Sequence, residues 1–384
     1  MTRKREVDWD PRAKHVLRDQ RAAYDQMRET YPVAYSDLMK WSVFRHADVL
    51  HILHHPEIFS SAVSRHLSVP SGMDPPEHTA YRGIVERYFR PEGMTAFEPT
   101  CRQIARRLVQ RAVEQGGGEI MADLALPFSV QVQGAFLGWP DEFQAPVVRW
   151  LHASHRATLA QDRTALSDLA RQFESFVDEI IEQRIQSNAD PAHDLMAALI
   201  SERVWDRPLS NEEITSILRN WTAGEVGTIA SAVGILAHFL AEHPELQAQL
   251  REDPSLVPPA IEEVLRIDGP LAANRRVTTQ EVEIGGRTIA AGEPVSIIWI
   301  SANRDGRVFA EPESFRWDRD PELNLLWGAG IHVCPGAPLA RLEMRLLIEE
   351  LLEQTVEISR IAEKPPKRAA YPTTGFSDLH LRMQ

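Results

Sequence analysis

The sequence predicts a mainly α-helical protein with a small β portion, folded as one domain over residues 1–384. Three observations support this fold class. Apolar residues recur at helical spacing through most of the chain, whereas strand signals are few and cluster late. Hydrophobic residues make up 43% of the chain and charged residues 25%, which is typical of a globular protein. No internal repeat, low-complexity tract or long Gly/Ser linker divides the chain into separate domains.

The expected elements follow from periodicity and turn chemistry. Amphipathic helices are predicted at residues 13–29, 47–54, 76–89, 94–115, 166–187, 194–202, 244–250, 258–267 and 338–354. A tight hairpin is predicted at 282–289, because the central Gly285-Gly286 pair permits the positive φ that such turns need. The apolar, β-branched run 294–300 favours a buried strand.

A long helix is predicted at residues 211–241. Ser210 with Glu213 forms a capping box at its start. The segment is apolar on most sides, which is typical of a helix in the middle of a protein. Glu225 and Thr228 fall within one of its apolar stripes, and a buried carboxylate is costly unless it has partners or a task. Glu225 is therefore either a hydrogen-bonded structural residue or a proton-handling group.

Composition excludes several classes of protein. The net charge of -13 argues against nucleic-acid binding, because no cationic phosphate footprint is present. No signal-peptide pattern and no apolar stretch of about 20 residues is seen, so we expect a cytoplasmic protein without a membrane anchor. The two cysteines, Cys101 and Cys334, exclude a structural zinc cluster. A disulfide between them is not expected without an export signal.

The segment from Trp327 to Gly336 carries the chemistry, with the sequence Trp-Gly-Ala-Gly-Ile-His-Val-Cys-Pro-Gly. Its glycines let the backbone turn tightly and approach a flat ligand. Cys334 precedes a helix expected to begin near Pro338, and a helix N-terminus stabilises a thiolate. A single soft thiolate suits iron better than zinc. A nucleotide-binding loop is excluded, because Val333 stands at the third glycine position and no parallel-sheet unit surrounds it.

This segment resembles the haem-binding loop of the cytochrome P-450 family, whose pattern is Phe-Gly-x-Gly-x-His-x-Cys-x-Gly. Every position agrees except the first, where Trp327 replaces the phenylalanine that normally packs over the sulfur. The resemblance covers nearly the whole chain. It implies the cytochrome P-450 fold, haem b as cofactor and Cys334 as the iron ligand.

Other family landmarks occur in the same order. Glu263 and Arg266 match the ExxR motif, whose members share one helical face and form an ion pair. Four cationic side chains match the family's positions for binding the haem propionates, although each by itself could be a surface cation. They are His78, Arg82, Arg276 and His332.

The resemblance also implies partners. No flavin or iron–sulfur segment fits within 384 residues beside this fold. We therefore expect O2 as oxidant and a separate ferredoxin with its reductase as electron donor. A basic docking surface for the acidic ferredoxin is expected from four arginines, with ordinary solvated charges as an equal alternative. These arginines are Arg87, Arg90, Arg341 and Arg345.

The expected substrate is a small apolar or aromatic molecule. The segments that match the family's substrate contacts are mainly small and aliphatic. They are residues 63–69, 218–225, 271–274, 296–298 and 373–376. Arg65 and His66 are candidates for pairing with a substrate carboxylate, with solvent exposure as the favoured alternative. The loop before Asp74 is short and is expected to lack a helix of its own.

The long helix departs from the family pattern Ala-Gly-x-Asp/Glu-Thr. This chain reads Ala-Gly-Glu-Val-Gly-Thr, so Val226 stands at the acid position and Gly227 at the alcohol position. Glu225 and Thr228 are three residues apart on one helical face, and we predict that they act as a displaced acid–alcohol pair. Proton delivery through water or a substrate hydroxyl is an alternative.

The predicted function is therefore a haem-thiolate monooxygenase that hydroxylates or O-dealkylates its substrate. One alternative is a peroxide-driven peroxygenase, which Val226 and Gly227 favour. Another is a non-catalytic haem-thiolate binding or sensor protein. The presence of Glu225 and Thr228 argues against this alternative.

Overall fold

The computed structural model describes residues 6–64 and 66–384. These residues form two compact units. The first consists of the described residues before His66 together with 259–334 and 367–377, and the second of 66–258, 335–366 and 378–384. Arg65 lies outside the described residues, and so does its predicted contact with a substrate carboxylate.

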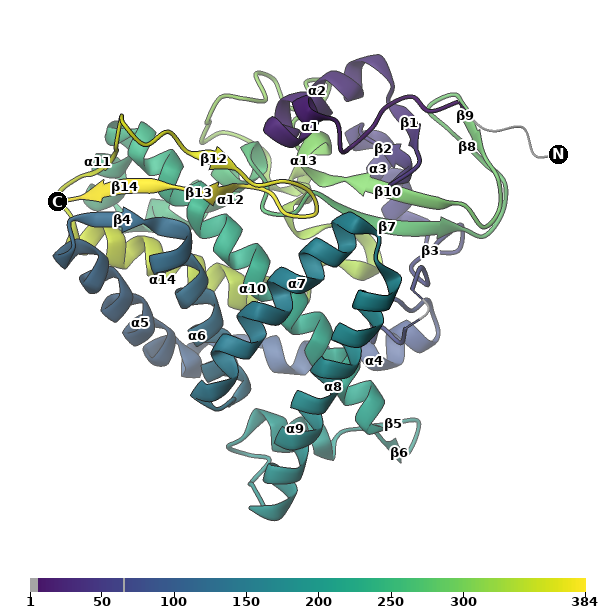
Figure 1. The fold of residues 1–384 in the computed structure, drawn as a ribbon, viewed down its shortest axis with the longest axis horizontal. Coiled ribbons are helices and arrows are strands. Elements are labelled where there is room, and N and C mark those ends of the chain that lie inside the picture. Colours follow the sequence, from purple (N-terminus) through teal and green to yellow (C-terminus); the bar gives the residue numbers. More distant parts are fainter. Residues whose placement is uncertain (1–5, 65) are drawn as a thin grey trace. The chain divides into compact units, whose positions relative to one another are not determined.

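The first unit contains a five-stranded sheet in the order β1-β2-β10-β7-β3 (Figure 1). Its strands are β1 Val33–Ser36, β2 Lys40–Val43, β3 Phe59–Ser60, β7 Ala273–Thr278 and β10 Pro294–Ile298. Strand β10 is parallel to β2 and antiparallel to β7. The predicted hairpin is confirmed as β8 Val282–Ile284 and β9 Arg287–Ile289, with φ of 55° at Gly285 and 74° at Gly286.

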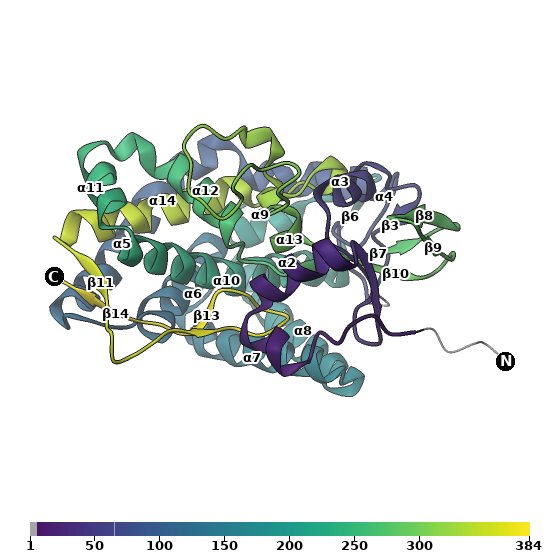
Figure 2. The same cartoon turned by 90° about the horizontal axis from the view of Figure 1, so that it is seen from above.

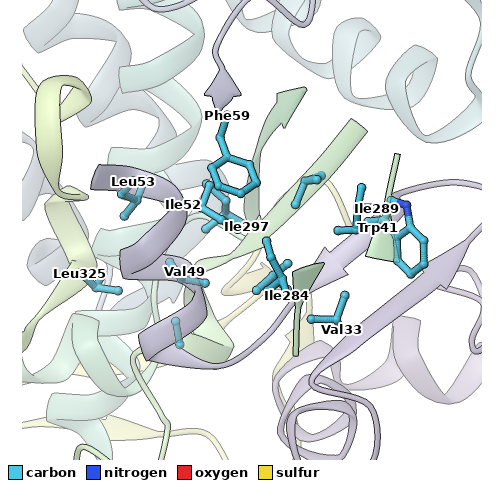
Figure 3. Packing of buried hydrophobic residues seen from close by; sticks show 13 residues of the cluster. Val33, Trp41, Val49, Ile52, Leu53, Phe59, Ile284, Ile289, Ile297 and Leu325 are labelled. Carbon is cyan, nitrogen blue, oxygen red and sulfur yellow. The ribbon is translucent and has the colours of Figure 1, made fainter. Parts of the chain in front are cut away.

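A hydrophobic core joins this sheet to helix α3 His46–His54. Figure 3 shows Val49, Ile52 and Leu53 of the helix beside Ile297 of β10 and Phe59 of β3. Alternate strand residues reach this core because successive side chains of a strand point to opposite faces. The core also includes Leu325, which lies nine residues before Cys334. The segment that leads into the cysteine loop is thus fixed by apolar packing.

The helices of the first unit correct two expectations. Its helices are α1 Lys14–Arg18, α2 Gln20–Thr30, α3, most of α12 Val257–Ile267, and α13 Trp299–Ala302. The helix expected over 13–29 is broken at Asp19, whose backbone is extended and whose side chain caps α2 by accepting from the Ala22 amide. The strand expected over 294–300 ends at Ile298, where α13 begins.

The second unit is mainly helical. Its helices are α4 Glu77–Val85, α5 Pro91–Glu114, α6 Leu126–Leu137, α7 Gln144–Ala160, α8 Arg163–Gln186, α9 Leu195–Ser201, α10 Asn211–Glu242, α11 Pro244–Glu252 and α14 Ala337–Gln354. A three-stranded sheet, β11 Ile358–Arg360, β14 His380–Met383 and β4 Gly117–Glu119, lies at its edge. Short pairs are β5 Arg203–Val204 with β6 Arg207–Pro208, and β12 Lys367–Arg368 with β13 Phe376–Asp378 at the unit boundary. Helices α5, α6, α10 and α14 pack together as a bundle (Figure 2).

Helix α10 is the central helix of this bundle. The predicted capping box of Ser210 and Glu213 is present at its start. It is the one helix of the described residues that is long and apolar enough to cross a membrane, but 61% of its apolar window is buried inside the protein. Such burial is the property of a core helix, as the apolar stripes predicted.

Two helices of the bundle region were not predicted. Helix α6 follows a π-helical turn, Met121–Ala125, and buries residues on most of its circumference, so it has no amphipathic period. Helix α7 contains Pro146 in its first turn, and a proline there is compatible with a helix. The absence of a helix before Asp74 is confirmed for the described residues between Ser60 and Glu77.

Candidate functional site

The cysteine loop is a tight backbone turn. Two short 3-10 turns, η6 Leu325–Trp327 and η7 Gly330–His332, precede Cys334. The Cys334 amide donates a hydrogen bond of 2.8 Å to the Trp327 carbonyl oxygen, which closes the loop. Gly328 and Gly330 have φ of 76° and 68°, a region that residues with a side chain rarely adopt.

Gly330 is required at its position for a second reason. A Cβ atom there would lie 2.3 Å from the carbonyl oxygen of Leu53 in α3. Only a residue without a side chain allows the loop to approach α3 this closely. The glycines around Cys334 therefore allow both the tight turn and its close packing against the backbone of α3.

Helix α12 holds the segment before the loop through a buried ion pair. Glu263 accepts hydrogen bonds from Arg266 at 2.7 and 2.9 Å, which confirms the ion pair expected from ExxR. Arg319 donates to the same carboxylate at 2.7 Å. Arg266 also donates to the carbonyl oxygen of Asn303, whose side chain in turn accepts from the Leu325 amide. Sequence reasoning missed Arg319, because its contact spans 56 residues.

A second glutamate of α12 binds the loop directly. The indole Nε1 of Trp327 lies 2.9 and 2.8 Å from the two carboxylate oxygens of Glu262. The Glu262 carbonyl oxygen accepts a hydrogen bond from Asn324 at 3.1 Å. Sequence reasoning missed Glu262, although an unusual tryptophan at position 327 signals a need for a partner for its N–H group.

Two of the four predicted propionate-binding residues lie in the first unit. Arg276 is on β7 with 7% of its surface exposed, and its guanidinium donates to the Arg275 carbonyl oxygen at 2.8 Å. The His332 Nε2 lies 2.9 Å from the Ser61 hydroxyl oxygen. Each cationic or donor group is thus held in place by a neighbour of its own unit.

The other two lie on α4 in the second unit. His78 and Arg82 are one turn apart, and Arg82 forms an ion pair of 2.6 Å with Glu86. His78 is buried, and burial, with Arg82 as the next cause, lowers the pKa of its imidazole. A neutral imidazole still has one N–H group with which to donate to a carboxylate.

The middle of α10 has an exposed strip on an otherwise buried helix. Ala223 and Gly224 are exposed, and Gly227 and Thr228 are partly exposed. These positions share one face because they are spaced by three and four residues. The strip offers small side chains, including the methyl group of Ala223 and the hydroxyl of Thr228.

Glu225 points to another part of the second unit. Its carboxyl group lies against that of Glu343 on α14, and Gln133 of α6 is 3.5 Å from its Oε2. As two ionised carboxylates, Glu225 and Glu343 would have no donor between them and would leave enclosed oxygens unsatisfied. A proton on one of them makes the pair hydrogen-bonded.

Electrostatics favour that protonated pair. Burial is the largest cause that raises the pKa of both carboxyl groups, and the charge of Glu225 raises that of Glu343 further. Two carboxyl groups at one enclosed site cannot both ionise without a large cost. Cys101 on α5 is also buried, and burial followed by these two glutamates raises the pKa of its thiol. Cys101 is therefore a poor thiolate ligand.

These residues fit a haem group. A loop with one cysteine can supply one thiolate, and buried cationic side chains suit propionates. No cluster of three or more metal-ligating side chains occurs among the residues that the structure describes.

The expected basic docking surface is partly neutralised. Arg87 pairs with Glu202 at 2.9 Å, and Arg345 pairs with Glu98 at 2.8 Å. Arg90 and Arg341 are exposed.

Comparisons with known proteins identify the family. A family model described as Cytochrome P450 matches residues 140–369. The chain is 32% identical over 362 residues to the cyclomarin C epoxidase CymV of Salinispora arenicola, covering 85% of this chain and 87% of that protein. It is 34% identical over 328 residues to the nocardicin C N-oxygenase of Nocardia uniformis, covering 81% of each. The structure of CYP109E1 from Bacillus megaterium in complex with corticosterone has a TM-score of 0.84 and 28% identity, covering 96% of this chain and 100% of that one. The chain therefore belongs to the cytochrome P450 family and is a haem-thiolate monooxygenase.

Proposed function

We propose that this monooxygenase hydroxylates or O-dealkylates a small apolar or aromatic substrate, with haem b bound through the thiolate of Cys334. The observation that carries the proposal is the loop around Cys334. It combines the family pattern with a tight turn, a required glycine at 330 and a hydrogen bond from the Cys334 amide to Trp327. Cys101 is the competing thiol, and its burial among carboxyl groups opposes ionisation.

Four residues are proposed to hold the haem propionates. Arg276 and His332 of the first unit and His78 and Arg82 of the second are the candidates. Support comes from their match to the family positions and from the burial of Arg276 and His78. A charge-assisted hydrogen bond of this kind contributes about 1.5–3 kcal/mol.

When bound, the haem supplies the activation of O2, and its thiolate ligand favours O–O cleavage. The chain's own side chains would hold and transfer protons and exclude water. Thr228 places a hydroxyl on the exposed strip of α10. Burial raises the pKa of the neighbouring carboxyl groups of Glu225 and Glu343, which favours a proton shared by the pair. We propose that Thr228 and Glu225 serve as the displaced acid–alcohol pair, with the proton held on the α14 side of the helix.

The substrate class is proposed from the side chains of the matching segments. Ile298 and Ala272 are buried and apolar, and Leu271 next to Ala272 is 39% exposed. The bridge between Leu271 and Thr373 brings two of the predicted substrate segments together in the first unit. Corticosterone in the related structure is an apolar ligand of the kind that such side chains would bind.

A peroxide-driven reaction is the second candidate. The observation that favours it is the pair Val226 and Gly227, which stand where the family carries an acid and an alcohol. Val226 is fully buried and has no group that can transfer a proton. Such a site would depend on an oxidant that brings its own protons.

We also propose the setting in which the enzyme works. A separate ferredoxin and reductase would supply electrons, and the protein would be cytoplasmic. The two units would belong to one haem domain, because the chain passes between them at 65/66, 258/259, 334/335, 366/367 and 377/378.

One experiment separates the candidates. The haem-loaded protein would be given a panel of apolar and aromatic substrates with ferredoxin and reductase, with peroxide, or with neither. We expect product with the donor chain at a higher rate than with peroxide. Faster turnover with peroxide would favour the peroxygenase, and no product under any condition, despite binding of haem and substrates, would favour a sensor.

A further inference from the structure

Two consecutive glutamates of α12 have different partners. Glu263 binds the arginine pair described above, whereas Glu262 binds the indole of Trp327 with both carboxylate oxygens, at 2.9 and 2.8 Å. Consecutive helix residues point about 100° apart, so one turn of α12 holds two separate segments. Glu262 is partly buried, which strengthens a hydrogen bond between its charge and an N–H donor.

The contact continues from Trp327 to the cysteine. The carbonyl oxygen of Trp327 accepts the hydrogen bond of the Cys334 amide at 2.8 Å. Trp327 is therefore fixed at its side chain by Glu262 and at its backbone by Cys334. A second bond, from Asn324 to the Glu262 carbonyl oxygen, ties the start of the same segment to α12.

The indole also has one hydrogen to donate. That hydrogen is directed at the Glu262 carboxylate, which places a negative charge beside the loop segment. Charge near an iron ligand is one of the factors that set its reduction potential.

We propose that Glu262 is a positioning residue for the cysteine loop: it holds the Trp327 indole and through it fixes the geometry and the electronic environment of the Cys334 thiolate. This inference rests on the proposed role of Cys334 as the iron ligand. Glu262 would act through Trp327, without itself contacting the metal.

A double-mutant cycle on the haem-loaded enzyme tests the proposal. The measured quantity is the rate at which the reduced carbonyl complex converts from its thiolate-type spectrum to the spectrum without thiolate. We expect Glu262→Ala to accelerate this conversion roughly tenfold, the size of one lost charge-assisted hydrogen bond. Trp327→Phe should have a similar effect, and the double variant should add little, because each change removes the same bond.

Two further variants separate the anchor from the charge. Glu262→Gln keeps an acceptor for the indole, so it should convert at a rate close to that of wild type, while its reduction potential rises because an anion is lost. The control is Glu322→Ala, which removes a carboxylate from an exposed position five residues before Trp327. It should leave the conversion rate unchanged.

Several outcomes would overturn the inference. Additive effects of Glu262→Ala and Trp327→Phe would show that the two side chains act independently. A lower melting temperature for Glu262→Ala with an unchanged conversion rate would assign Glu262 a role in stability alone. Loss of the thiolate-type spectrum in Cys334→Ser, with wild-type behaviour of all Glu262 variants, would reject this inference and leave the proposed function intact. Retention of that spectrum in Cys334→Ser would reject the proposed function instead.

Discussion

At the scale of single residues, the two cysteines differ in what surrounds their sulfur atoms. Cys101 lies inside the helix bundle of the second unit, where burial and the nearby carboxyl groups raise the pKa of its thiol. Cys334 lies in a turn whose backbone is fixed by glycines and by Trp327. Burial thus keeps Cys101 protonated, whereas Cys334 lies in the loop that we propose presents it as the iron ligand.

The first prediction concerns the iron ligand. Cys334→Ser should abolish the thiolate-type spectrum of the reduced carbonyl complex, because a hydroxyl does not replace a thiolate. Cys101→Ala should retain that spectrum and lose only packing. Absorption spectroscopy of both purified variants decides the assignment, and a normal spectrum in Cys334→Ser would refute it.

A second residue-scale feature is the carboxyl pair of Glu225 and Glu343. Its pKa values are raised above those of the unfolded chain, mainly by burial. Above about pH 4.5 this pair therefore binds more protons in the folded protein than in the unfolded chain. The stability that these protons contribute is fully present below the unfolded pKa and is lost as the pH rises through the folded pKa.

The second prediction follows from this loss of stability with rising pH. Glu343→Gln removes one titrating group and supplies an amide donor to Glu225. The stability of the variant relative to wild type should therefore increase as the pH rises above about 5. The increase should be at most about 1.4 kcal/mol per pH unit for each proton that the wild-type pair keeps and the variant lacks. Denaturant unfolding of both proteins at several pH values measures this difference, and parallel stability curves would contradict it.

At the scale of elements, the loop and its supporting helices are held by a few contacts between distant segments. Gly330 rests on the Leu53 carbonyl of α3, and Glu263 of α12 joins Arg266 to Arg319. These contacts fix the direction in which the chain enters Cys334. A substitution in them should affect haem binding although none of them is a ligand.

The third prediction compares two glycines with similar backbone angles. Gly330→Ala and Gly292→Ala both force a side chain to a positive φ, of 68° and 78°, which costs about 1–2 kcal/mol. Only the Gly330 variant also places a Cβ against a backbone oxygen, because nothing lies within 4 Å of a Cβ at 292. Gly330→Ala should lower the melting temperature and the haem content much more than Gly292→Ala does. Equal losses would show that the close approach to α3 is unimportant.

The fourth prediction compares two arginines three residues apart. Arg319→Ala removes a buried partner of Glu263 and should destabilise the protein by about 3 kcal/mol. Arg316→Ala removes only exposed pairs with Asp318 and Glu311 and should cost less than about 1 kcal/mol. Unfolding in denaturant measures both. Similar costs would mean that the Glu263 carboxylate is satisfied without Arg319.

At the scale of the whole molecule, the charge distribution constrains the electron donor. The net charge of -13 would repel the acidic ferredoxin proposed as donor, so productive association with it would need local positive charge. Of the four arginines predicted as a dock, Arg87 and Arg345 are neutralised by carboxylates of the second unit. Arg90 and Arg341 are exposed.

The fifth prediction concerns that association. If Arg90 and Arg341 attract the ferredoxin, replacing both with alanine should slow reduction of the enzyme at low salt about tenfold. The wild-type rate should fall with rising ionic strength, because salt screens the local attraction. Arg171→Ala on α8, which removes an exposed arginine outside the predicted dock, is the control. A wild-type rate that rises with salt would show that net repulsion dominates and that no basic dock operates.

Much of the site could be predicted from sequence because its signals are local. Glycines with positive φ, a cysteine before a helix and an ExxR pair depend on residues that are close along the chain. Amphipathic helices and the Gly285-Gly286 hairpin were confirmed for the same reason. Helix α6 was missed because a helix buried on most sides has no apolar period to detect.

The sequence by itself determined the family, the fold class and the identity of the candidate ligand, because these depend on short patterns in which each residue type has a physical reason. Only the tertiary structure decided which distant groups meet. It placed Glu343 against Glu225, Glu262 against Trp327 and Arg319 against Glu263. Such contacts join segments more than 50 residues apart. Whether a carboxyl group is ionised, shared or used as an anchor depends on burial and on its neighbours in space, and neither is encoded at any single position of the chain.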